Sequence, residues 1–356
     1  MTSAAPRSPG CERATPPIPS DGTDLGDAFQ CACCGGTDSE PAGRYELPTR
    51  RADDGRVVGM AYPLRSCTTC HHVQACPRPS DDELTRYYEE DFWTDRGVSA
   101  GAITGDWHHL LTETSALWER FERADKQVSH LVASAGLTPS ARVADLGSGL
   151  SPVLYHFRQR GFTDLHALEP FEGICDYLQG QGITTYATLL EDFIERDDLP
   201  EFDAMVISHT VEHLADPELV LCGLRRHLAP GGVLYVDVPH RDDLLPSHEG
   251  LHLHFFAPDP LSRLMVNSGF EVDAVEVDHL SALDRALLKV LYAVYGRFLG
   301  NRGGLGTRPA IERLHRWVWR PTSRLLRLNV KIFVSVQDLR LVGRTTRPAS
   351  AAVSPE

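Results

Sequence analysis

From Ala141 onward the sequence alternates short apolar runs with amphipathic segments, and this alternation constrains the fold more than any other feature. Short apolar runs bounded by turn residues are typical of buried strands, and apolar positions three and four apart are typical of helices. We predict strands at residues 142–146, 165–168, 202–207, 232–238, 270–277 and 330–342, and helices at 152–159, 173–179 and 217–228. Such an alternation predicts a parallel, doubly wound α/β sheet.

The chain divides into parts of different composition. Residues 1–28 are rich in Pro, Ser and Ala without an apolar period, which predicts a disordered tail, and 346–356 form a second one. Residues 29–80 are rich in cysteine and turn residues, whereas 81–137 show helical spacing and predict a helical linker or substrate lid. The sheet domain is expected over 138–345.

One segment of the sheet domain differs in charge from the rest. The chain has 35 Lys and Arg against 49 Asp and Glu, a net charge of −14, but residues 281–328 alone carry +8 and leave −22 for the remainder. Apolar stripes in this segment predict a basic helical insertion. Core packing or dimerisation, membrane-surface contact with anionic lipid or a lipid-linked glycan, and RNA contact remain open for it. The acidic remainder argues against broad nucleic-acid binding.

The sequence also bears on localisation. No apolar core of a signal peptide follows Met1, and no uncharged apolar run approaches the roughly 18 residues that cross a bilayer. We therefore expect a cytoplasmic protein that reaches a membrane only peripherally, through residues 281–328.

Seven of the nine cysteines lie within the first 76 residues and indicate a metal site. Cys31 and Cys34 form one Cys-x-x-Cys pair, and Cys67 and Cys70 form a second, with 32 residues between the pairs. Two such pairs place four thiolates around one ion, and a closed set of four makes the zinc structural rather than catalytic. Alternative ligands are Cys33, His71, His72 and Cys76. Free thiols and redox activity are the competing interpretations.

A glycine-rich turn follows the first strand of the sheet domain at residues 143–151, VADLGSGLS. Gly147 and Gly149 permit a tight turn and a close approach of the backbone to a ligand, at the positive end of the next helix. Glu169 stands twenty residues after Gly149, at the end of the second strand, where a carboxylate binds ribose hydroxyls. Ser151 replaces the third glycine of a dinucleotide fingerprint, so the turn predicts a nucleoside-like ligand.

The motifs occur in the order seen in class I S-adenosylmethionine-dependent methyltransferases, which residues 138–280 resemble. The matching residues are Asp145-x-Gly147-x-Gly149, Glu169-Pro170, Glu191-Asp192-Phe193, Phe202-Asp203, His209-x-x-Glu212-His213, Asp216-Pro217 and Leu228-Ala-Pro230-Gly231-Gly232. The resemblance implies a Rossmann-like, seven-stranded α/β sheet with its last strand antiparallel, joined here to a small N-terminal zinc ribbon and a helical insertion. A different Rossmann-type nucleotide binder is the competing interpretation.

The resemblance also implies roles for individual residues. The methionine part of S-adenosylmethionine would face Asp145 and the backbone of Gly147, Ser148 and Gly149. Glu169 would bind the ribose, and Asp192 and Phe193 would lie near the adenine. Ser208 and His209 would line the methionine side after the fourth strand.

The order of a ribbon before the sheet domain is similar to methyltransferases of polysaccharide and natural-product pathways. In sugar C-methyltransferases of this kind a catalytic Tyr-x-Glu-His segment follows. The nearest match is 248–256, HEGLHLHFF, in which His252 falls on the histidine, while Leu251 replaces the glutamate and Glu249 the tyrosine. The candidates for proton transfer are therefore His252, His209 and Glu249, on loops at the carboxyl ends of strands.

The sequence predicts transfer of a methyl group to an oxygen or carbon of a small-molecule, sugar-nucleotide or glycan acceptor. An RNA methyltransferase and a non-catalytic scaffold that binds partners through its ribbon are the alternatives. Residues 209–213, HTVEH, also match a metallopeptidase pattern. That pattern requires a long helix, whereas these residues directly follow a predicted buried strand, so we do not expect a peptidase.

Overall fold

The computed structural model describes residues 29–50, 57–88, 92, 103–112, 115–240, 251–277 and 338–345. The two predicted tails, the basic segment 281–328 and Glu249 lie outside these ranges. The predictions made for them are therefore not addressed by the fold.

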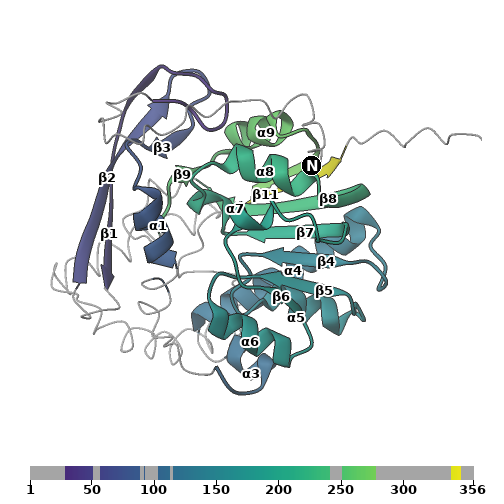
Figure 1. Ribbon diagram of the computed structural model, residues 1–356. Coiled ribbons are helices and arrows are strands. Elements are labelled where there is room, and N and C mark those ends of the chain that lie inside the picture. The colour runs from purple at the N-terminus through teal and green to yellow at the C-terminus, as the bar shows by residue number, and fades with distance from the viewer. Residues whose placement is uncertain are drawn as a thin grey trace, which may run out of the picture.

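The larger of two sheets has seven strands in the order β10-β11-β8-β7-β4-β5-β6 (Figure 1). Its strands are β4 (Val143–Leu146), β5 (Leu165–Leu168), β6 (Thr184–Tyr186), β7 (Phe202–Ser208), β8 (Leu228–Pro239), β10 (Phe270–Val277) and β11 (Asp338–Thr345). The pairs among β4 to β8 are parallel, and β11 lies antiparallel between β8 and β10. The expected α/β sheet with its last strand antiparallel is confirmed.

Helices cover both faces of this sheet, as a doubly wound fold requires. One face carries α3 (Trp107–Thr112), α4 (Ser115–Ala135), α5 (Pro152–Gln159) and α6 (Glu172–Gly180). The other carries α7 (Leu190–Phe193), α8 (Pro217–Arg225) and α9 (Pro258–Asn267). The described part of the predicted linker 81–137 thus includes α3 and α4, whose apolar side chains belong to the core of the sheet domain, and α1 (Asp81–Arg86), which packs with the N-terminal strands.

The central strands send alternate residues to the two faces. In β7, Ala204 and Val206 pack under α3–α6, whereas Met205 and Ile207 pack under α7–α9. Parallel strands between two helical layers are buried on both faces, which explains why they appear in the sequence as continuous apolar runs. This core fixes the loops at the carboxyl ends of β4, β5 and β7, where ligands bind in such sheets.

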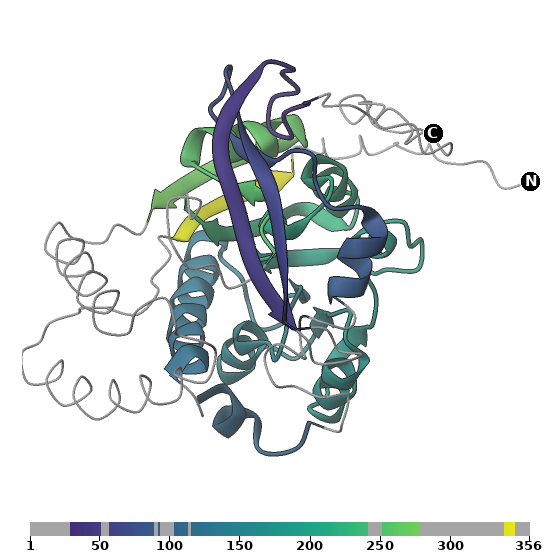
Figure 2. The ribbon, with the colours of Figure 1, turned by 90° about the vertical axis from the view of Figure 1, so that its left-hand side faces the viewer.

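The N-terminal part forms a second, four-stranded sheet in the order β1-β2-β3-β9. It consists of β1 (Ser39–Arg50), β2 (Val57–Cys67), β3 (Val73–Ala75) and β9 (His254–Phe255), with α1 (Asp81–Arg86) beside it. The long hairpin β1–β2 crosses in front of the sheet domain in Figure 2. Because β9 comes from the later part of the chain and pairs with β3, backbone hydrogen bonds tie the N-terminal strands to the segment that leads into α9.

Side chains also tie the ribbon to the sheet domain. The amide of Asn267, at the end of α9, donates to the carbonyl of Cys33 at 3.0 Å. Phe29 and Cys33 share one apolar cluster with Leu261 and Leu264 of α9. The ribbon is therefore packed onto the sheet domain.

Most predicted elements match the structure, and the differences have physical reasons. The helix predicted at 217–228 ends at Arg225, because the N–H groups of Arg226 and His227 donate to carbonyls three residues back and the chain then enters β8 at Leu228. The last strand was predicted at 330–342, and its described part is Asp338–Thr345. The hairpin β1–β2, the strand β9 and the helix α9 were not predicted.

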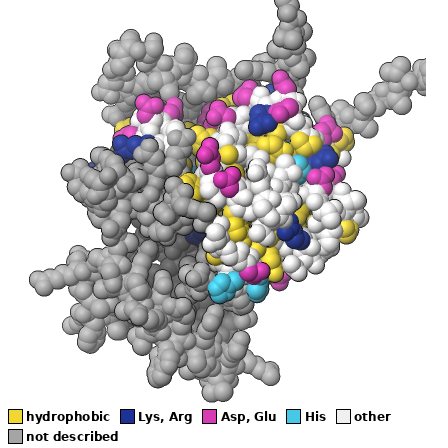
Figure 3. Space-filling view, turned by 60° about the horizontal axis from the view of Figure 1, so that its bottom comes forward, with side chains coloured by type: hydrophobic (Ala, Val, Ile, Leu, Met, Phe, Trp, Pro, Cys, Tyr) yellow, Lys and Arg dark blue, Asp and Glu magenta, His cyan; other side chains and the backbone are white. Residues whose placement is uncertain are grey.

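No helix among the described residues has the length and apolar character needed to cross a membrane. On the face that includes α3 and α6, the visible Asp and Glu side chains are scattered between apolar and neutral ones (Figure 3). The described part of this face thus shows no continuous basic surface.

Candidate active site and metal centre

The turn after β4 is held by a network that starts at Asp145. Asp145 is buried, and one of its carboxylate oxygens accepts a hydrogen bond of 2.7 Å from the hydroxyl of Ser151. The same hydroxyl oxygen accepts from the N–H of Leu154 at 3.2 Å and so caps α5. Ser151 therefore explains the missing third glycine, because its side chain both begins the helix and fixes the carboxylate.

Gly147 is required in this turn for two reasons. Its φ of 75° is a left-handed conformation that favours glycine. A Cβ at this position would also overlap the hydroxyl of Thr210 and lie 2.9 Å from its methyl group. The N–H groups of Gly147 and Ser148 both donate to the carbonyl of Leu168 at 2.9 Å, so the turn is anchored to β5.

Glu169 closes the other side of this turn. One of its carboxylate oxygens accepts from the N–H of Gly149 at 3.0 Å, and the other accepts from the N–H of Phe171 at 3.2 Å. The side chain is largely buried at the end of β5. Asp145 and Glu169 thus place two carboxylates on either side of one glycine turn.

The electrostatics of the two carboxylates are linked. Burial raises the pKa of Asp145 to about 7; the hydrogen bond from Ser151 opposes this rise, and the charge of Glu169 adds to it. A buried carboxylate close to a second one holds its negative charge at an energetic disadvantage. A cationic group bound beside Asp145 would remove that disadvantage, so the site favours a positively charged ligand group.

The two residues predicted beside adenine lie on α7 and have different environments. Asp192 is exposed, whereas the side chain of Phe193 is fully buried and packs against Tyr186, with ring centroids 5.1 Å apart. Because that ring lies in the core, Phe193 offers only its backbone to a ligand.

Ser208 and His209 lie at the carboxyl end of β7, next to the glycine turn. The adjacent Thr210 donates its hydroxyl to the carbonyl of Leu146 at 3.2 Å, which joins the ends of β7 and β4. The N–H of His209 donates to the carbonyl of Asp237 at 2.7 Å, and its φ is 54°. Asp145, Gly147, Ser148, Gly149, Glu169, Ser208 and His209 are therefore brought to one edge of the sheet, which we call the cofactor edge.

Two polar residues at this edge were not predicted. Gln127 of α4 donates its amide to the hydroxyl of Ser208 at 3.1 Å and to a carboxylate oxygen of Asp237. Both Gln127 and Asp237 are buried. They come from a helix and a strand that are distant in the chain, so no local sequence motif predicts their contact.

A second unpredicted group lies beside His209. Glu212, with a side-chain exposure of 1%, has a carboxylate oxygen 3.5 Å from Nδ1 of His209 and 3.9 Å from Nε2 of His213. His252, the predicted base, is buried, and its ring centroid lies 4.8 Å from that of His213. The sequence signal for this group was the pattern at residues 209–213, but the third member comes from a segment forty residues later.

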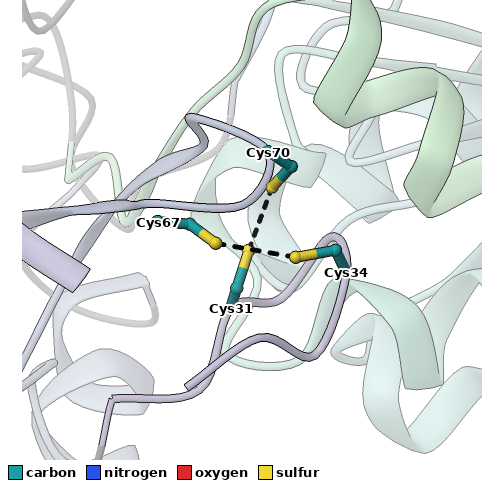
Figure 4. Close-up of side chains that lie close together, drawn as sticks. All are labelled: Cys31, Cys34, Cys67 and Cys70. Carbon is teal, nitrogen blue, oxygen red and sulfur yellow. Dashed lines mark hydrogen bonds between the residues drawn. The ribbon is translucent and has the colours of Figure 1, made fainter. Parts of the chain in front are cut away.

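The four predicted metal ligands converge on one point (Figure 4). The Sγ atoms of Cys31 and Cys70 are 3.4 Å apart, and those of Cys34 and Cys67 are 3.6 Å apart. Four thiolates at about 2.3 Å from one zinc ion have sulfurs roughly 3.8 Å apart, so the cluster nearly has the dimensions of a tetrahedral site. All four positions are filled by protein, which leaves no position for a substrate.

The two turns that carry these cysteines are built alike. In each, the N–H four residues after the first cysteine donates to that cysteine's carbonyl, from Gly35 at 2.8 Å and from His71 at 2.9 Å. Gly35 and His71 both have positive φ, 70° and 61°. His71 therefore closes its turn in the conformation that glycine adopts in the first one, and its role is explained without metal binding.

The remaining alternative ligands have other surroundings. Cys33 is fully buried and packs toward α9. His72 is fully buried with Nε2 3.1 Å from Nδ1 of His254, which in turn bonds the carbonyl of Leu214. Burial lowers the pKa of His254 to about 4, so this histidine is neutral where it contacts His72 of the ribbon.

The strand order, the glycine turn and the two carboxylates define the nucleoside-binding sheet of class I methyltransferases. Residues 118–275 match the family model of a methyltransferase domain. This range includes α5, β4 to β9 and most of β10, and thus the whole cofactor edge. The chain therefore carries an S-adenosylmethionine-dependent methyltransferase domain, and it is an enzyme of the transferase class.

Solved structures with similar folds include two methyltransferases. The 1,6-didemethyltoxoflavin-N1-methyltransferase of Burkholderia thailandensis, with bound 1,6-didemethyltoxoflavin and S-adenosylhomocysteine, is 15% identical, over 79% of this chain and 98% of that one, with a TM-score of 0.45. Magnesium protoporphyrin IX methyltransferase of Synechocystis, with bound S-adenosylmethionine, is 13% identical, over 57% and 92%, with a TM-score of 0.41. No curated protein matches the sequence.

Proposed function

We propose that this enzyme transfers a methyl group from S-adenosylmethionine to an oxygen or carbon of a small-molecule, sugar-nucleotide or glycan acceptor. The observation that carries the proposal is the pair of carboxylates, Asp145 and Glu169, on the two sides of the Gly147–Gly149 turn. When bound, the cofactor supplies a methyl group on a positively charged sulfur, and the electron pair of the breaking carbon–sulfur bond stays on that sulfur.

The residues present fit this cofactor. Asp145 is a buried carboxylate that a cationic amino group would stabilise, so it suits the methionine end. The two carboxylate oxygens of Glu169 each accept from one backbone N–H, which fixes their orientation, and each keeps a second lone pair that can accept from a ribose hydroxyl. Gly147 keeps side-chain atoms out of the turn, which permits the backbone to approach the ligand.

His209 is best placed to take the acceptor proton. Its side chain is 25% exposed, and the carboxylate of Glu212 stands 3.5 Å from its Nδ1, so Nε2 is directed away from Glu212. His252 is nearly buried, with its ring stacked on Tyr45 at 6.3 Å. Glu249, the third candidate, stays a prediction because it lies outside the described residues.

We also propose that Cys31, Cys34, Cys67 and Cys70 bind a structural zinc ion. The dimensions of the cluster and its fully protein-derived ligand set support this function. The ribbon would then present a rigid surface beside the cofactor edge, because β3 pairs with β9 directly after His252.

The proposal is tested by methyl-labelled cofactor offered with sugar nucleotides, small phenolic and amino-sugar acceptors, and RNA. We expect label in the low-molecular-mass fraction, and His209→Gln should lower kcat at least 100-fold while binding of S-adenosylhomocysteine stays within twofold. Label in RNA alone would support the RNA-methyltransferase alternative. That residues 281–328 bind a membrane surface or a second copy of the chain stays a prediction.

A further inference from the structure

Behind His209 lies a buried group of one carboxylate and two imidazoles, from Glu212, His213 and His252. Their ligand atoms lie within 4.8 Å of one another. The short 3-10 helix Val211–His213 carries the first two, and the N–H of Leu253 donates to the carbonyl of Glu212 at 2.8 Å. That hydrogen bond fixes the neighbouring His252 beside the helix, so the group is built by the fold.

The hydrogen bonds of His213 determine which of its ring nitrogens faces the carboxylate. Nδ1 lies 2.6 Å from the carbonyl of Leu251, which only accepts, so Nδ1 carries a proton and donates it. Nε2 is then directed toward a Glu212 oxygen 3.9 Å away, and in the neutral ring this nitrogen carries the lone pair that binds a metal ion. The carboxylate of Glu212 attracts a cation to the same place.

The spacing of these atoms suits a metal ion better than a direct hydrogen bond. The distance of 3.9 Å between Nε2 and the carboxylate oxygen is longer than the roughly 2.7–3.2 Å of a hydrogen bond. Two nitrogen or oxygen ligands at about 2.0–2.2 Å from one ion lie roughly 3.0–3.6 Å apart, so a small contraction forms the site. The bond from Nδ1 of His213 to a backbone carbonyl is also the arrangement that orients metal-binding histidines.

We propose that Glu212, His213 and His252 bind a divalent first-row transition ion, such as Zn²⁺, at a second metal site. Two imidazoles and one carboxylate suit such ions and leave coordination positions open. Glu212 and His252 are almost fully buried, whereas the side chains of His213 and His209 are 14% and 25% exposed. The more exposed side of the group is therefore the side of His213 and His209.

This placement deepens the proposed function, on which the following role rests. An acceptor oxygen bound to the ion would ionise more readily, and His209 beside it would take the released proton. The preferred acceptor would then be a compound with a hydroxyl or carboxylate that coordinates a metal. His252 would hold the ion instead of transferring the proton itself. The fold supplies the third ligand that the motif at 209–213 lacks in sequence.

The site is tested with Co²⁺ added to the full chain whose ribbon is already loaded with zinc. We expect one cobalt per chain beyond the zinc, with weak visible absorption typical of nitrogen and oxygen ligands and without a sulfur-to-metal charge-transfer band. The paramagnetic ion should also shift the ring N–H proton resonances of two histidines. Absence of a second equivalent, or a spectrum with only sulfur ligation, would overturn the proposal.

Variants assign the ligands. Glu212→Gln and His252→Gln should each weaken cobalt binding at least tenfold while the zinc content is kept. The matched control is His130→Gln, since Nδ1 of His130 lies 3.8 Å from a carboxylate oxygen of Glu276 with no third ligand among the described residues, and this variant should bind cobalt normally. Cobalt binding unchanged in both ligand variants would contradict the site. Calorimetry with S-adenosylhomocysteine on the same samples tests the methyltransferase function independently.

Discussion

The four-cysteine cluster and the cofactor edge differ in which parts of the chain supply their residues. The cluster takes all its ligands from two short turns of the same geometry, and each turn closes its own backbone hydrogen bonds. The cofactor edge takes Asp145, Glu169 and His209 from the ends of three separate strands, which only the packed sheet brings together. The cluster is thus built to stabilise the ribbon, whereas the edge is built to hold a ligand.

The two regions should therefore respond differently to substitution. The four-cysteine cluster is held by its ligands, so the ribbon should lose structure when one of these cysteines is replaced. A site supported by a packed sheet should lose binding while the fold persists, because parallel strands and their helices are held by apolar burial.

The largest effect is expected for Cys67→Ser. Cys67 ends β2 and is fully buried in the cluster, so its replacement should release the zinc and lower the thermal midpoint by about 10 °C or more. The measurements are zinc content and thermal denaturation. The control is Cys33→Ala, a buried cysteine outside the four-membered cluster, which should keep its zinc. If Cys33→Ala loses its zinc and Cys67→Ser keeps it, Cys33 is a zinc ligand in place of Cys67.

Gly147→Ala should affect both stability and binding, because this residue belongs to the sheet and to the ligand turn. Its positive φ and the overlap with Thr210 should destabilise the fold by about 2–4 kcal/mol. Gly136→Ala is the control, since Gly136 has a φ of 64° but no atom within 4 Å of the added Cβ. Chemical denaturation of both variants, and of Gly147→Ala with Thr210→Ala, separates strain from overlap; equal losses would remove the overlap from the explanation.

Glu169→Gln should weaken binding without unfolding the protein. Loss of the charge that accepts from ribose hydroxyls should raise the Kd of S-adenosylhomocysteine about 10- to 100-fold, measured by calorimetry. Glu172→Gln, at an exposed position in the first turn of α6, is the control and should leave the Kd unchanged. Equal affinities for the two variants would take Glu169 out of the ribose site.

Asp145→Asn should show an effect that depends on pH. The pKa of Asp145 is raised to about 7 in the folded chain, so its carboxyl stays protonated there while the unfolded chain ionises near pH 4. The wild type therefore loses stability as the pH rises from about 4 to 7, by about 2 kcal/mol or more, and the variant does not. The ligand-free variant should gain in unfolding free energy over the wild type between pH 5 and pH 8. If the difference in unfolding free energy between the variant and the wild type does not change with pH, the raised pKa of Asp145 is contradicted.

The two regions also differ in how far the sequence predicts them. The spacing of Cys31, Cys34, Cys67 and Cys70 specifies the whole cluster, because the ligands lie within two local turns. The strand–turn–helix pattern around Asp145 and Glu169 likewise predicts the main carboxylates of the edge. Local patterns identify residues whose environment is set by their neighbours in the chain.

What the sequence did not predict depends on pairing between distant segments. The strand β9 has only two residues and exists because His254 and Phe255 pair with Gln74 and Val73 of the ribbon. The same pairing brings His252 to Glu212, and the packing of α4 brings Gln127 to Ser208. A two-residue strand has no periodicity of its own, so no window of sequence indicates it.

The edge formed by β4, β5 and β7 should bind the cofactor of a methyltransferase. The most direct test is calorimetric titration of the folded, zinc-loaded chain with S-adenosylhomocysteine. We expect one binding site per chain with a Kd in the micromolar range. No heat of binding from protein with an intact fold and full zinc content would contradict the account and favour the scaffold alternative.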